Sequence, residues 1–124
     1  MSVVAIIGIL VAIAFPSYQT HLRKGRRAEA QSFMLEAANR QQQYLMDARA
    51  YALGSGSTFL TTLSLTPATS VTNFYALTVT PAAATTPPSF TIVATPIAGT
   101  PQEPDGILTL DNTGAKTRSG NAGW

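Results

Sequence analysis

The sequence predicts an α+β fold in which one long N-terminal helix packs by its C-terminal half on a small antiparallel sheet. Residues 1–16 form an almost purely apolar run, and residues 17–52 continue with helix-forming residues whose apolar positions recur at helical spacing. Residues 73–124 then hold short segments of alternating apolar and polar residues, separated by prolines and turn residues. This order indicates a helix that covers one face of a small sheet.

Residues 1–16 are expected to form a helical stem that finds no cover within its own subunit. The segment carries no charged side chain. Three surroundings explain such an apolar segment: a lipid bilayer, a cleavable signal peptide, or packing against other copies of the chain. A secretory signal places its positive charges before the apolar run, whereas here they follow it. The side chains expected to pack in the core of an assembly are Val3, Val4, Ile6, Ile7, Ile9, Leu10, Val11, Ile13 and Phe15.

Residues 17–52 are predicted to be the amphipathic half of the same helix. No proline and a single glycine, Gly25, interrupt the stretch from Ser17 to Tyr51. Together with the stem, this gives a helix of about 50 residues, about 75 Å long when straight. The residues expected to pack on the sheet are Phe33, Ala37, Tyr44 and Leu45.

Gly8 and Pro16 are predicted to weaken the stem. Pro16 has no backbone N–H, and its ring crowds the carbonyl of Ala12, so a kink or local unwinding is expected there. Gly8 adds a second flexible point because it lacks a side chain.

Residues 53–72 are predicted to be a partly ordered loop. Glycine, serine and threonine dominate this segment. Four apolar residues in it still need burial, so the loop is expected to lie across the rest of the domain. They are Phe59, Leu60, Leu63 and Leu65.

The last segment, residues 73–124, is predicted to be an antiparallel meander with a C-terminal loop. The strand candidates are residues 73–80, 89–95 and 106–111, with a short fourth strand at 115–118. Prolines at the joints suit loops of several residues. The terminal Trp124 is expected to fasten the tail if its ring packs on the domain.

Positive charge is concentrated directly after the stem. Arg23, Lys24, Arg26 and Arg27 lie within five positions, in a chain whose net charge is only +2. Such a cluster is typical of a membrane–water boundary. It is equally typical of a solvated helical face, and the charges alone leave both interpretations open.

The residues that catalysis needs are sparse and scattered. The chain has one histidine, His21, and no cysteine, and its carboxylates form no pair at a spacing that suggests shared acid–base chemistry. The acidic turns at 104–106 and 111–112 fit turn geometry better than a calcium loop. The sequence therefore predicts no enzyme, no cofactor and no metal site.

Two further functions find weak support. The basic cluster lacks interleaved aromatic residues, and residues 53–124 carry only Lys116 and Arg118 against three acids, so DNA binding is a weak expectation. Aromatic residues along the helix invite electron conduction, but rings on a helical stripe are ordinarily packing residues. Those aromatic residues are Phe15, Tyr18, Phe33, Tyr44 and Tyr51.

The stretch from Val3 to Tyr18 resembles the N-terminal signature of bacterial type IV pilins. Residues 27–31, 42–44 and 106–116 are similar to the major pilins of Gram-negative bacteria, so the resemblance covers essentially the whole chain. The first motif is shared with the pseudopilins of secretion systems. The last motif favours true pilins.

This resemblance implies features that residues 1–124 do not contain. Family members carry further residues ahead of what is Met1 here, including an aromatic residue that becomes N-methylated and a glutamate that pairs with a neighbouring subunit. Many also close a C-terminal loop with a disulfide near the positions of Asp105 and Gly123, where this chain has no cysteine. The tail is therefore expected to depend on strand pairing and on Trp124.

The function that the resemblance implies is that of a structural subunit of a type IV pilus, polymerised through the stem into an extracellular filament for adhesion and twitching motility and, in some members of the family, DNA uptake. The implied partners are other copies of the chain, the inner membrane before assembly and the pilus assembly machinery, with DNA as a weaker partner. In the filament, the segment from Gly8 to Pro16 is predicted to lose helical hydrogen bonds. The alternatives are a minor pilin that acts as a DNA receptor and a pseudopilin of type II secretion.

Overall fold

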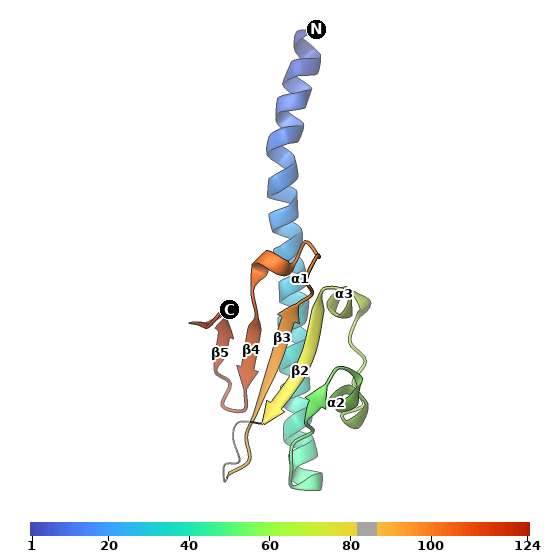
Figure 1. Ribbon diagram of the computed structural model, residues 1–124, viewed down its shortest axis with the longest axis vertical. Coiled ribbons are helices and arrows are strands. Elements are labelled where there is room, and N and C mark those ends of the chain that lie inside the picture. Colours follow the sequence, from blue (N-terminus) through green and yellow to red (C-terminus); the bar gives the residue numbers. More distant parts are fainter. Residues whose placement is uncertain (82–86) are drawn as a thin grey trace.

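The structure is a computed structural model that describes residues 1–81 and 87–124. A single helix, α1 (Ser2–Ala48), stands out from a small head that contains every strand (Figure 1). Helix α1 contacts the head from about Arg23 onward, whereas residues 1–18 are all exposed and extend away from the head as a free stem. The predicted α+β fold is therefore confirmed.

The head is built on one antiparallel sheet of six strands in sequence order, which is a meander. Its strands are β1 (Gly54–Ser55), β2 (Tyr75–Pro81), β3 (Phe90–Pro96), β4 (Leu108–Asp111), β5 (Lys116–Arg118) and β6 (Asn121–Ala122). The longest ladder pairs β2 with β3, with Tyr75 opposite Pro96. All four predicted strands are present within one or two residues of their expected limits, but the loop expected between β2 and β3 falls mainly on residues 82–86, outside the described residues.

The segment 53–72 is more regular than the predicted loop. It contains β1 and two short helices, α2 (Ser57–Thr62) and α3 (Thr69–Thr72). Phe59, Leu63 and Leu65 are buried as expected, and Leu60 packs partly against the same cluster. These apolar side chains hold the short helices against the core, which explains why a polar sequence folds there.

The core lies between the C-terminal half of α1 and one face of the sheet (Figure 1). The buried side chains of α1 are Ala30, Phe33, Met34, Ala37 and Gln41. On β3 the buried residues alternate with partly exposed ones, which is the pattern of a strand with one covered face. Tyr44 and Leu45 are both half-buried, and Tyr44 packs against the core.

In the isolated subunit α1 runs without interruption through Gly8 and Pro16. The local unwinding expected at Pro16 is therefore absent from this state. A proline removes one hydrogen bond while its φ stays compatible with a helix, so the flanking turns can hold the helix together. At its C-terminal end Arg49 adopts a left-handed conformation with φ 57°, and its N–H donates to the carbonyl of Leu45 at 2.8 Å.

Candidate functional site

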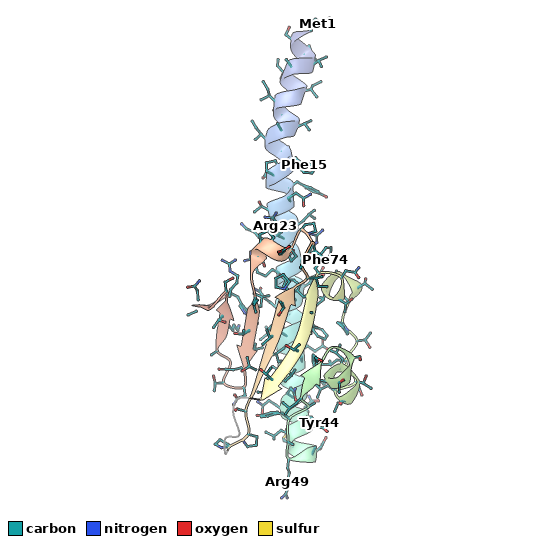
Figure 2. The ribbon with its side chains drawn as sticks, viewed as in Figure 1. Met1, Phe15, Arg23, Tyr44, Arg49 and Phe74 are labelled. Atoms are coloured by element: carbon teal, nitrogen blue, oxygen red, sulfur yellow. The ribbon has the colours of Figure 1, made fainter. Side chains whose placement is uncertain are left out.

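The stem is apolar and uncovered along its whole length. From Val3 to Phe15 the exposed fraction of its large apolar residues runs from 55% at Ile7 to 74% at Val4, and Figure 2 shows the side chains projecting on all sides from Met1 to Phe15. Helix α1 is long and apolar enough to cross a membrane. No residue in its most apolar stretch is buried within the subunit. The predicted lack of cover within the subunit is what the structure shows, whereas packing of the stem side chains in a filament stays a prediction.

A second feature, called here the basic pocket, lies where the stem enters the head. It has a volume of about 240 Å³ and lies between α1, the short helix η1 (Glu103–Asp105) and β5. Its lining residues are Thr20, Arg23, Lys24, Arg27, Pro104, Asp105 and Arg118. Positions 20, 23, 24 and 27 fall on one helical face because they are separated by three or four residues.

Two of the pocket's arginines are fixed by contacts with the loop between β3 and β4. The Nε atom of Arg23 donates to the carbonyl of Pro101 at 2.8 Å. Nη1 of Arg27 lies 3.2 Å from Oδ1 of Asp105, and both side chains are largely buried. These contacts orient the two guanidinium groups before any ligand arrives.

Behind Asp105 a buried polar network ties the loop to the sheet. The hydroxyl of Tyr75 donates to Oδ2 of Asp105 at 3.0 Å, and Nε2 of Gln102 donates to the Tyr75 oxygen at 2.9 Å and to the carbonyl of Arg23 at 3.1 Å. Burial, together with the nearby charge of Asp105, raises the pKa of the Tyr75 phenol well above its usual range. Tyr75 therefore stays a neutral donor.

The pocket carries an excess of positive charge. Within residues 1–81 and 87–124 the Arg27–Asp105 contact is the only ion pair, and it uses the pocket's one carboxylate. Lys24 and Arg118 are both exposed, and neither has an ionic partner in that part of the chain. An anion that enters the pocket would therefore meet cations that the protein has not neutralised.

The structure divides the basic cluster that the sequence presents as a unit. Arg26 does not line the pocket, and its guanidinium instead lies 4.0 Å from the centre of the Phe74 ring. Arg118 takes its place from a distant part of the chain. Sequence reasoning missed this arrangement, because the register of β5 on β4, with Arg118 opposite Leu108, is what brings Arg118 to the stem end of the head.

The C-terminal tail is fastened as the sequence predicts. Nε1 of Trp124 donates to the carbonyl of Thr117 at 3.1 Å, and Nζ of Lys116 lies 4.8 Å from the ring centre. Lys116 and Arg118 are exposed on one face of β5, whereas Thr117 between them is partly buried. The tail therefore presents two cations on the same side.

A protruding apolar helix packed on an antiparallel meander, with no other cover for its front half, is the architecture of a type IV pilin. The family model described as "Type IV minor pilin ComP, DNA uptake sequence receptor" matches residues 16–105. The chain therefore belongs to this family of type IV minor pilins. The match supports a minor pilin better than the major pilin that the sequence motifs favoured. A comparison with curated proteins finds no match.

Proposed function

We propose that this chain is a minor pilin that binds DNA and joins type IV pili through its stem. The observation that supports this most directly is the family match, which covers residues 16–105 and belongs to receptors of DNA uptake sequences. In this proposal the precursor is held in the inner membrane by the stem, and the assembly machinery then transfers it to an extracellular pilus. The role is binding and assembly, without catalysis.

The proposed DNA-binding surface is the exposed face of β5, with Lys116 and Arg118 as its cations. Three acids in the head argue against DNA binding when charges are counted along the sequence. The structure weakens that objection, because Asp105 forms an ion pair with Arg27. Oδ1 of Asp111 accepts hydrogen bonds from the backbone N–H groups of Thr113 and Ala115 in the turn that follows β4. Lys116 and Arg118 together give this face a positive potential along which a phosphate backbone can lie, and Arg118 also lines the edge of the basic pocket.

Binding of fluorescent duplex DNA to the full chain in detergent micelles tests this proposal. The wild-type protein is expected to bind with an affinity that falls steeply with salt, and Lys116→Glu is expected to weaken binding about 10-fold and to lower the salt slope. Arg40→Glu is the matched control, because Arg40 is exposed on α1 far along the helix from the pocket. Equal binding by the two variants, or no binding by the wild type, would refute the proposal.

A major structural pilin is the competing function, because the motif at residues 106–116 that resembles major pilins lies outside the family match. The composition of sheared surface filaments distinguishes the two. Mass spectrometry is expected to find this chain as a trace component of fibres made of another pilin. Fibres made mostly of this chain would favour the major pilin instead.

A further inference from the structure

We propose that the basic pocket binds the phosphodiester of an anionic phospholipid headgroup while the stem is held in the membrane. This inference goes beyond DNA binding and does not depend on it. It assigns a ligand to the stem-side cations Arg23, Lys24 and Arg27, which the DNA-binding surface on β5 does not use.

The first argument is position. Arg23 lies at the junction of the stem and the head (Figure 2). The apolar run of the stem ends at Phe15, and Tyr18 follows it three residues later. Tyrosine is enriched at the membrane–water interface. Arg23 lies five residues beyond Tyr18, about 8 Å along the helix axis. Since the headgroup layer is about 5–8 Å thick on each side of the bilayer, the pocket is level with the lipid phosphates when Tyr18 lies at the edge of the hydrocarbon.

The second argument is the chemistry of the pocket. Pro101 and Asp105 already hold the guanidinium groups of Arg23 and Arg27, so little side-chain freedom is lost when an anion binds. Lys24 and Arg118 supply charge that no described carboxylate neutralises. Thr20 forms part of the wall but provides no donor, because its hydroxyl donates to the carbonyl of Pro16 at 3.0 Å. The site is therefore built from cations, which suits a phosphodiester monoanion.

The third argument separates lipid from DNA as the occupant. A DNA phosphate could reach the pocket of a membrane-held subunit only if the duplex approached the anionic membrane surface, which repels it. Lipid headgroups are present at that level at high local concentration. In the register of β5 on β4, Arg118 lies opposite Leu108 and Lys116 opposite Leu110, so Lys116 is the cation of β5 farther from the pocket and stays available to DNA.

Native mass spectrometry of the full chain, released from micelles that contain equal amounts of phosphatidylglycerol and phosphatidylcholine, tests the proposal. Both lipids carry the same phosphodiester, but the choline of the second neutralises it. The wild type is expected to retain phosphatidylglycerol at least about 5-fold over phosphatidylcholine. Lys24→Glu is expected to abolish this preference, and Arg40→Glu is expected to keep it. Equal retention of the two lipids by the wild type, or an unchanged preference in Lys24→Glu, would overturn the proposal.

A parallel measurement of duplex DNA binding separates this proposal from the proposed function. Loss of DNA binding in Lys116→Glu with the lipid preference intact supports two separate sites. Failure of every form to bind DNA while the lipid preference remains would refute only the DNA proposal. Loss of DNA binding in Lys24→Glu without any change in lipid retention would assign the pocket to DNA and refute the lipid proposal. Because Lys24 is exposed, the variant is expected to fold, and its thermal unfolding curve checks this.

Discussion

Arg27 of α1 and Asp105 of η1 form an ion pair, with 3.2 Å between Nη1 and Oδ1, that fastens the loop between β3 and β4 to the helix. The two residues are far apart in the sequence, yet their side chains are only 14% and 7% exposed. The pair also forms one wall of the basic pocket. The stability of the head and the proposed anion binding at its stem end therefore depend on the same contact.

Replacing Arg27 by methionine is expected to lower the free energy of unfolding by about 3 kcal/mol, because it leaves the buried carboxylate of Asp105 without its counter-charge. Denaturant unfolding of the full chain in detergent measures the loss. Arg40→Met is the control, since it makes the same change at an exposed position of the same helix. A loss no larger than that of the control would show that water already screens the pair.

Gln41 is predicted to determine where the chain leaves α1. It is fully buried, its Nε2 donates to the carbonyl of Ala52 at 2.6 Å, and its Oε1 accepts from the Ala52 N–H at 2.9 Å. Gln41→Leu leaves both backbone groups unpaired in a buried site and is expected to cost about 3 kcal/mol. The exposed Gln43→Leu is expected to cost almost nothing.

Hydrogen exchange provides a local readout for the same pair of variants. Faster exchange is expected at residues 49–56 in Gln41→Leu and not in Gln43→Leu, because only the first change frees the turn after α1. Slow exchange throughout that segment in both variants would contradict the proposed role of Gln41.

Periodicity along the chain was sufficient to predict the fold. The spacing of Phe33 and Ala37 identifies the buried face of α1, and the alternation in residues 89–95 identifies β3 with one covered face. Both signals are local, because each depends only on which side of a helix or strand a residue occupies. The helices of residues 57–62 and 69–72 were not predicted, since tertiary burial of Phe59 and Val71 stabilises them against a polar sequence.

The basic pocket could not be predicted in the same way. Arg23, Lys24 and Arg27 are adjacent in the sequence, but Arg118 and Asp105 reach them only through the register of β4 and β5 and the course of the preceding loop. Nor does the sequence indicate that Arg26, inside the cluster, lies over Phe74 instead. These contacts are long-range, so neither composition nor spacing reveals them.

Asp111 is predicted to make stability depend on acid pH. Burial tends to raise the pKa of its carboxyl, but hydrogen bonds from the Thr113 hydroxyl and from the backbone N–H groups of the turn outweigh burial and lower it. The folded-state pKa of Asp111 lies below the unfolded-state value of about 3.9. The contribution of the carboxylate to the free energy of unfolding is therefore complete above the unfolded-state pKa and is lost as the pH falls through the folded-state pKa.

Unfolding measured between pH 2 and pH 7 tests this dependence. Asp111→Asn keeps an acceptor oxygen but cannot titrate, so its stability is expected to be lower at neutral pH and to fall less on acidification. Asp47→Asn changes an exposed carboxylate at the end of α1 and is expected to preserve the wild-type slope. Parallel pH curves for wild type and Asp111→Asn would exclude Asp111 as the source.

Trp124 is predicted to hold the last two strands in place without a disulfide. Strand β6 pairs with β5 through two residue pairs, and the N–H of Gly123 donates to the carbonyl of Lys116 at 2.7 Å. The indole contacts with Thr117 and Lys116 add to this short attachment. Trp124→Ala is expected to cost about 1 kcal/mol overall and to speed hydrogen exchange across residues 116–122. Trp124→Phe keeps a ring but loses the N–H donor, so its stability and exchange rates are expected to lie between those of the wild type and Trp124→Ala. Unchanged exchange in the alanine variant would contradict the proposed attachment.

The stem is predicted to change conformation when it enters a filament. In the isolated subunit α1 is continuous from Ser2, although Pro16 leaves the carbonyl of Ala12 without its helical donor. Gly8 marks the other end of the weakened segment. A Cβ at Gly8 would meet no atom within 4 Å, so contacts within the subunit do not require glycine there. Packing among stems is therefore expected to melt residues 8–16, where the cost is lowest.

Spin labels can measure this change within single subunits, because the chain contains no cysteine and two can be introduced at Ala5 and Gln19. A continuous helix separates these positions by about 21 Å. In micelles that distance is expected, whereas in assembled pili with dilute labelled subunits it is expected to increase, because an extended residue spans about twice the rise of a helical one. Pro16→Ala restores the missing N–H and is expected to reduce the increase. A distance of about 21 Å in wild-type pili would show that the stem stays helical, and the prediction would then be wrong.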